Sequence, residues 1–194
     1  MKPRINKKLN LVITVDDASG AKIHVHSTPI SREVFETFYE ELGLVFTKSF
    51  GESGSVHMAI SAPQLAYPAL KKVGEEKNNW DVIKSGLVNE ILRLTNIIYL
   101  SDGGWTTVPL EVAVKEEIID EDSEREVLSS LIFFTAITFV APKQLVKGFL
   151  DMAAALRSWA VTSSSSTEYK NGLLTSTETE ITGTITLSRV PSAT

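Results

Sequence analysis

Residues 9–27 read LNLVITVDDASGAKIHVHS, two runs rich in β-branched residues around a polar turn that ends in Gly20. Two such runs on either side of a glycine-containing turn are typical of a β-hairpin. The pattern therefore predicts an N-terminal hairpin over residues 9–27, with one face of each strand turned toward a core.

A helix is expected soon after the hairpin. Ser31 is suited to cap its N-terminus, and Ile30 and Phe35 occupy the two positions of a hydrophobic staple. The apolar residues that follow recur at steps of three and four, as in a helix with one buried face. We expect one amphipathic helix over residues 32–50, with these apolar positions: Phe35, Phe38, Leu42, Val45 and Phe46.

Three further segments read as helices before the middle of the chain. Residues 56–76 are apolar but contain Pro63 and Pro68, which predict broken or kinked helices. Residues 81–98 carry apolar side chains at helical spacing behind Asp81 as a cap, and residues 101–104 are expected to end that helix. A short helix over residues 109–118 can place proline at its first position.

The longest apolar run extends from Val127 to Pro142 and is too short to cross a bilayer. Ser123 and Glu126 have capping-box spacing, which favours a central helix over residues 124–140. The β-branched content of the run leaves a buried strand open as an alternative.

A last helix is expected over residues 143–160, and beyond it the composition changes. From Val161 to Thr194, 16 of 34 residues are Ser or Thr, which is typical of a tail. Residues 179–188 alternate between apolar and polar and can add one strand. The predicted fold is α+β and mostly α: one domain over residues 1–161, with the hairpin, a helical body of five to six helices over residues 31–160, and a tail over residues 162–194.

Composition limits the class of partner. The chain has 24 acidic and 19 basic residues, no cysteine, and 43% hydrophobic residues, so it has no basic excess for nucleic acid or an anionic membrane. The first ten residues lack the apolar stretch of a secretory signal. We expect an intracellular globular protein that binds neither nucleic acid nor membrane.

The sequence contains no complete catalytic or cofactor-binding pattern. His24 and His26 share a strand face, as two zinc ligands can, but His57 is the only other histidine and lies in a different segment. Residues 120–131 fail the calcium-loop pattern at the glycine and glutamate positions, and residues 51–55 lack the last glycine of a nucleophile elbow. We therefore expect no metal, no cofactor and no enzymatic activity.

Five segments together resemble one family: Ser27–Glu36, Asn89–Asn96, Gly104–Leu110, Phe133–Thr135, and Leu156–Trp159 followed by the Ser/Thr-rich end. That family is the tail assembly chaperones of long-tailed, siphovirus-like bacteriophages. The resemblance covers most of residues 9–177, and none of its segments is catalytic.

The resemblance implies a non-enzymatic helper in the cytoplasm of the infected bacterium, absent from the mature virion. Such a protein coats the tape-measure protein and keeps it soluble until tail-tube subunits polymerise around it. A frameshifted longer form would recruit the tail-tube protein, and self-association is left open. The competing interpretation is a structural virion component, such as a tail completion or tube-associated protein.

A partner helix can be recognised in a groove lined by apolar and methionine side chains. The predicted last helix, at the edge of the helical body, is the candidate wall of such a groove. Its candidate partner-binding residues form one apolar stripe: Leu145, Phe149, Met152, Leu156 and Trp159. Burial of the same stripe in the core of the domain is the alternative.

Overall fold

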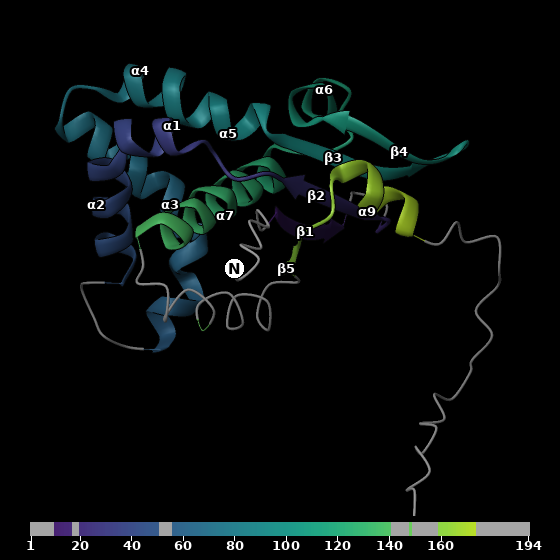
Figure 1. Ribbon diagram of the computed structural model, residues 1–194, viewed down its shortest axis with the longest axis horizontal. Coiled ribbons are helices and arrows are strands. Elements are labelled where there is room, and N and C mark those ends of the chain that lie inside the picture. The colour runs from purple at the N-terminus through teal and green to yellow at the C-terminus, as the bar shows by residue number, and fades with distance from the viewer. Residues whose placement is uncertain (1–9, 17–19, 51–55, 141–147, 149–158, 174–194) are drawn as a thin grey trace, which may run out of the picture.

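The computed structural model describes residues 10–16, 20–50, 56–140, 148 and 159–173. Within these residues the chain forms an α+β fold, in which helices pack against one antiparallel sheet of five strands (Figure 1). The fold class predicted from the sequence is confirmed, but strands interrupt the segment expected to be a helical body.

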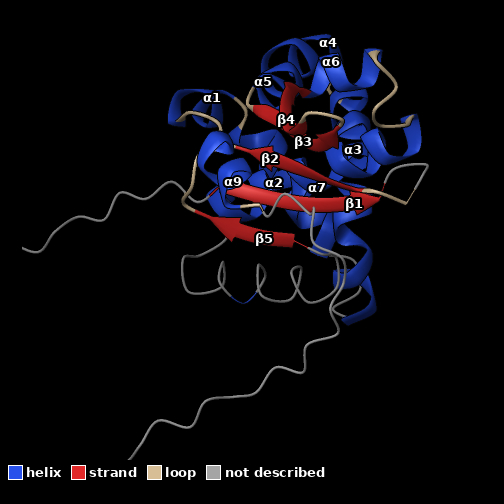
Figure 2. Ribbon diagram, turned by 90° about the vertical axis from the view of Figure 1, so that its right-hand side faces the viewer, coloured by secondary structure: helices blue, strands red, loops and turns tan. Residues whose placement is uncertain are grey.

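The sheet is assembled from distant parts of the chain. Its strands are β1 (Asn10–Asp16), β2 (Lys22–Ser27), β3 (Thr95–Ser101), β4 (Gly104–Pro109) and β5 (Trp159–Thr162). They lie in the order β4-β3-β2-β1-β5, and all neighbours are antiparallel (Figure 2). The predicted hairpin is confirmed as β1 and β2, with Ile13 opposite Val25.

The two faces of the sheet differ in chemistry because side chains alternate along each strand. The helix-facing side is apolar and belongs to the main core, with these buried residues: Leu11, Ile13, Ile23, Val25, Ile97 and Trp159. His24 and His26 alternate with Ile23 and Val25 and therefore lie on the opposite face.

The central helix is α7 (Glu121–Val140), so the helix expected there is confirmed and the strand alternative is not observed. Every residue from Val127 to Ile137 is buried, because α7 contacts α2, α3 and β1 around its circumference (Figure 1). Its start differs from the prediction. The Asp120 carboxylate accepts a hydrogen bond from the Ser123 N–H at 2.7 Å, so the capping residue is Asp120 and not Ser123.

The helix expected over residues 32–50 is divided into α1 (Arg32–Thr37) and α2 (Tyr39–Phe50). Ser31 caps α1 as predicted, because its hydroxyl accepts from the Val34 N–H at 3.3 Å. The break falls at Phe38, whose φ of -116° and ψ of 21° are not helical. Phe38 is nevertheless buried, so the break turns this ring into the core.

The prolines do not break the next helix. The structure has a single helix, α3 (Val56–Glu76), containing both Pro63 and Pro68. Each proline removes one backbone donor, while α3 packs along both α2 and α7 and buries Ala66 and Leu70 in the core. The expectation of broken helices is therefore wrong, because tertiary packing outweighs the local signal, while the alternative of a kinked helix stays a prediction.

The helical segment expected over residues 81–98 is shorter than predicted. It consists of α4 (Trp80–Ile83), the π-helical turn η1 (Lys84–Val88) and α5 (Asn89–Arg93). Asn79, not Asp81, precedes it. Ile98 lies in β3, and residues 101–104 form the turn to β4 and do not end a helix.

The short helix that follows is present as α6 (Leu110–Lys115), but it is shorter than the predicted span of residues 109–118, and proline is not its first helical residue. Pro109 precedes this helix as its N-cap and is also the last residue of β4.

The C-terminal part of the described chain also differs from the prediction. Trp159 begins β5 and is not part of a helix, and β5 supplies the fifth strand by pairing with β1. Structure continues past residue 161 as α9 (Ser166–Gly172), which carries a complete capping box between Ser165 and Glu168. The strand expected over residues 179–188 lies outside the described residues.

Candidate functional site

The predicted partner-binding stripe is only partly within the described structure. Leu145, Phe149, Met152 and Leu156 lie outside the described residues. Trp159 is 5% exposed and meets the Phe133 ring edge-on, with the ring centroids 6.1 Å apart. Trp159 therefore contributes to the core.

His24 and His26, which were expected to be strand residues that bind no metal, contact neighbouring polar groups. His24 Nδ1 lies 3.0 Å from the Thr14 hydroxyl oxygen. The Ser164 carbonyl accepts from His26 Nε2 at 2.9 Å and from the Asn10 amide at 2.7 Å. In the part of the chain that the structure describes, no three His, Asp or Glu residues are grouped to hold a metal ion.

Helix α9 contributes Tyr169 to this outer face of the sheet. The Tyr169 ring lies 5.7 Å from that of His24 and 6.2 Å from that of His26, and the Trp105 ring lies 5.5 Å from His24. Burial, with a smaller effect of Lys22, lowers the pKa of His24, and burial raises the pKa of Tyr169. Both shifts favour the neutral form of the side chain. The ring contacts of Tyr169 with His24 and His26 pack α9 against the sheet.

The remaining sequence motifs have structural roles or lie outside the described residues. Hydrogen bonds from the backbone and side chain of Ser123 hold the pKa of Asp120 below its usual range, as the N-cap role of Asp120 requires. Residues 51–55 lie outside the described residues. Across the ranges that the structure describes, no helix is both long and apolar enough to span a membrane.

An apolar groove of about 510 Å³ lies between α1, α2 and the end of α7, and we call it the α2–α7 groove. It is lined by Phe35, Tyr39, Glu40, Gly43, Leu44, Thr47, Phe139 and Val140. Phe35 and Phe139 stack at one side, with ring centroids 4.7 Å apart and planes inclined by 19°. Tyr39 is 62% exposed, so this groove presents an aromatic side chain to solvent.

The α2–α7 groove has one charged lining residue, Glu40, and this carboxylate is ion-paired, since it lies 2.9 Å from the Lys77 ammonium. Lys77 also lies 3.4 Å from the nearly buried Glu41 carboxylate. Its hydrogen bond to Glu40, followed by the two negative charges, raises the pKa of Lys77. This triad ties α2 to the end of α3.

From the sequence, part of the lining of this groove was expected only as the buried face of a helix. Phe35 belongs to the predicted apolar face, and Tyr39, four residues after Phe35 and three before Leu42, falls on that face although it is not among the positions named for it. The signal that could have revealed the groove is the pair itself, Tyr39 and the helix-interior Gly43 four positions later at the edge of the stripe.

A second pocket, of about 250 Å³, lies where α5, α6 and α7 meet. It is lined by Leu92, Leu110, Glu111, Val114, Lys115 and Glu124. Its charged residues have both signs and it is half the size of the α2–α7 groove, so it is the weaker candidate.

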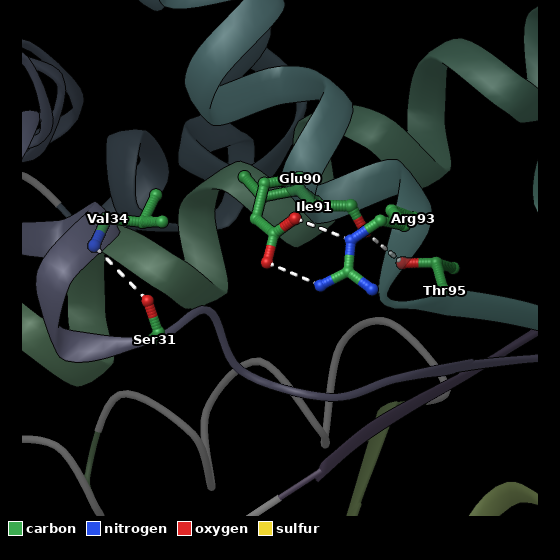
Figure 3. Close-up of polar contacts among 6 residues, drawn as sticks. All are labelled: Ser31, Val34, Glu90, Ile91, Arg93 and Thr95. Carbon is green, nitrogen blue, oxygen red and sulfur yellow. Dashed lines mark hydrogen bonds and ion pairs between the residues drawn. The ribbon is translucent and has the colours of Figure 1, made fainter.

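Two of the segments that carry the family resemblance meet at one junction. The Thr28 N–H donates to the Leu94 carbonyl at 3.1 Å. The buried Thr95 hydroxyl donates to the Ile91 carbonyl at 2.7 Å (Figure 3). The Thr95 hydroxyl oxygen also lies 2.9 Å from the Ser27 hydroxyl oxygen. These contacts join the end of β2 to the start of β3.

The same segments contain two local contacts on the surface. Ser31 caps α1, and the Arg93 guanidinium donates to both Glu90 carboxylate oxygens at 2.7 and 2.8 Å (Figure 3). The hydrogen bonds from Arg93 lower the pKa of Glu90. These described residues of the resemblance therefore have structural roles at the junction and in α1 and α5.

Comparisons of this chain with protein-family models, with curated proteins and with solved structures found no match.

Proposed function

We propose that this protein is a tail assembly chaperone of a long-tailed bacteriophage, which binds the tape-measure protein and keeps it soluble during tail-tube assembly. The observation that carries the proposal is the contact between two separated segments of the resemblance. Ser27 and Thr95 are 68 positions apart, yet their hydroxyl oxygens lie 2.9 Å apart and are buried. Two segments in contact limit the residues that each can carry. A resemblance that includes both segments is therefore expected if this chain shares the fold of that family.

The α2–α7 groove supports the same function. A chaperone for a long helical protein needs an apolar surface that accepts helices, and grooves between helices are a common means of binding them. The stacked Phe35 and Phe139 rings and the exposed Tyr39 give this groove that character. The family further suggests action in the host cytoplasm, absence from the mature virion, and a frameshifted form that recruits the tail-tube protein.

Co-expression with the tape-measure protein of the same phage tests this function. The soluble fraction of the tape-measure protein should rise several-fold when this chain is present, and it should not rise with an unrelated acidic protein of similar net charge. Co-purification of the two chains should accompany the rise. If the tape-measure protein stays insoluble with well-folded wild-type chain, the chaperone proposal fails.

A structural virion component is the second candidate, and one feature favours it. Strand β4 lies at an edge of the sheet, where unpaired backbone groups can bind a strand from a neighbouring subunit. Mass spectrometry of purified virions separates the two functions, since a virion component would be detected at a stoichiometric level and an assembly factor would be missing.

A further inference from the structure

The register of β4 shows which of its backbone groups point away from the sheet. Pro109 has no N–H, so its pair with Asn96 cannot be one of the pairs that exchange two hydrogen bonds. Pairs of the two kinds alternate along an antiparallel ladder. Thr107, two residues earlier and opposite Ile98, therefore has the same setting as Pro109. Its N–H and C=O point away from β3, to the side where the described chain has no further strand, and we call this side the β4 edge.

The two faces of β4 differ in polarity at this edge. Val108 packs against the main core. Thr107 points to the opposite face, and its hydroxyl oxygen is buried with no hydrogen-bond partner among the described residues. A strand added at the β4 edge would fit best with apolar side chains beside Val108 and hydroxyl side chains beside Thr107, because cross-strand neighbours on one face contact each other.

The sequence of residues 181–188, ITGTITLS, has this pattern, although these positions lie outside the described residues. In a strand, alternate residues lie on opposite faces. One face would be apolar apart from Gly183 and the other would carry only hydroxyl side chains. The apolar set is Ile181, Ile185 and Leu187, and the hydroxyl set is Thr182, Thr184, Thr186 and Ser188. The segment contains no charged residue, and charged side chains are a common means of preventing edge pairing.

The described chain brings this segment to the β4 edge. Helix α9 contacts both β3 and β4 (Figure 1). After its last residue, Gly172, the backbone is extended at Leu173, with φ of -76° and ψ of 130°. Residues 173–180 can span about 26 Å when extended, whereas the six residues of β4 cover about 20 Å. The connection is therefore long enough to reach either end of β4.

We propose that the β4 edge is the docking surface for residues 181–188 of the same chain, which add a strand to the five of the described sheet. Attachment to the same chain gives the segment an effective concentration on the order of millimolar, which favours it over the same segment of a second copy. The added strand hydrogen-bonds the outward backbone of Thr107 and places a hydroxyl side chain beside its buried hydroxyl. It also closes an edge that would otherwise accept a strand from another chain. This inference goes beyond the proposed function and does not depend on it.

Amide hydrogen exchange, measured by NMR on the full chain, tests the pairing. Neighbouring N–H groups of a strand point to opposite sides, so Thr184→Pro/Ile185→Pro removes whichever of the two faces β4. Exchange of the Thr107 N–H should be about tenfold or more faster in this double variant than in the wild type. Equal rates would overturn the proposal. A change confined to β5 would also overturn it, because the segment would then pair with the other edge of the sheet.

Two controls separate the loss of pairing from other effects of proline. Thr175→Pro/Ser176→Pro places the same two prolines in the connection, and its Thr107 N–H should exchange as slowly as that of the wild type. The N–H of Val25, in the central strand β2, should exchange at the wild-type rate in both double variants, which shows that the rest of the sheet is intact.

Engineered disulfides identify the copy that supplies the strand. The chain has no cysteine, so Thr107→Cys can pair only with a second introduced cysteine. It is combined in turn with Thr182→Cys, Thr184→Cys or Thr186→Cys, all on the hydroxyl face of the segment. At least one combination should form a disulfide within a monomer, as seen by non-reducing electrophoresis and mass spectrometry. Thr106→Cys, on the opposite face of β4, is the matched control and should form none with the same three partners.

Two results of the disulfide experiment contradict the proposal. A disulfide that joins two chains would make a second copy the occupant of the β4 edge. If none of the three combinations forms a disulfide, residues 181–188 do not lie beside Thr107. Neither result bears on whether the protein solubilises the tape-measure protein, so the proposed function is tested separately.

Discussion

The ring of Phe38 fills the space that a side chain on Gly86 would need, with Phe38 Cζ 2.5 Å from the Cβ position of Gly86. Phe38 is the residue that separates α1 from α2, and Gly86 lies in the π-helical turn between α4 and α5. Two local irregularities of the chain therefore fit each other, since the break directs the ring inward and the glycine makes room for it.

The first prediction concerns this pair. Phe38→Ala should lower the free energy of unfolding by about 3–5 kcal/mol through lost burial and the cavity left behind, and Gly86→Ala by about 1–3 kcal/mol through overpacking. The double variant should be less destabilised than the sum, because removing the ring removes the clash. Denaturant titration measures all three. Gly43→Ala is the control, and additive losses would show that the two residues do not share this space.

The second prediction concerns the junction of α5 and β3. Thr95 is fully buried, and its hydroxyl contacts both Ile91 and Ser27. Thr95→Val should destabilise the protein by about 1–3 kcal/mol, because it leaves the polar groups of Ile91 and Ser27 without this partner. Thr95→Ser, which keeps the hydroxyl, should be clearly milder in chemical denaturation. Equal losses for the two variants would assign the effect to packing.

The third prediction concerns Trp159. Truncation to alanine should cost about 3–5 kcal/mol, because the ring is buried against Phe133 on the core face of the sheet. Val161→Ala, on the same strand at 36% exposure, should change the stability by less than about 1 kcal/mol. Thermal unfolding of both variants provides the comparison. A near-neutral Trp159→Ala would place this ring at a surface and revive its role in partner binding.

The fourth prediction concerns pH. Burial lowers the pKa of His24 from 6.5, so the unfolded chain binds a proton at this position more readily than the folded chain. The contribution of His24 to stability is therefore fully present above 6.5 and is lost as the pH falls through 6.5 toward the lower folded value. Between pH 7 and pH 5, wild-type stability should fall more steeply than that of His24→Asn.

Three carboxyl groups in the described structure, Glu90, Asp120 and Glu168, also have lowered pKa values. They weaken the fold on acidification in the same direction, but only as the pH approaches 4.5 and below, where they are protonated. Above pH 5 these three carboxyl groups stay largely ionised, so the difference between wild type and His24→Asn in that window reports on His24. Parallel stability curves for wild type and His24→Asn in that window would refute its contribution.

Short-range signals predicted part of the fold correctly. The hairpin over residues 9–27, the Ser31 cap and the central helix all depend on patterns within a few residues, which the chain follows. The second hairpin was missed because Ile91, Leu94 and Ile98 also fit a helical period. The consecutive turn residues Asp102 and Gly103, between two β-rich runs, are a hairpin signal that this periodicity obscured.

The features that the sequence could not reveal depend on distant partners. Trp159 fits both a helical step and a strand, and only its pairing with Ile13 across the sheet decides between them. The α2–α7 groove requires the end of α7 to lie beside α2. Helix α9 is different, because the Ser165 and Glu168 capping box was visible in a segment interpreted from its composition alone as a tail.

The pairing of β1 with β5 cannot form until late in the synthesis of the chain on the ribosome. Asn10 and its partner Ser164 are 154 positions apart, and at bacterial and eukaryotic rates of roughly 5–20 residues per second their synthesis is separated by on the order of ten to thirty seconds. During that interval one edge of β1 has no strand beside it, and open edges bind other chains readily. The newly made protein is therefore most vulnerable just before its last strand emerges, whereas a refolding chain has that strand available from the start.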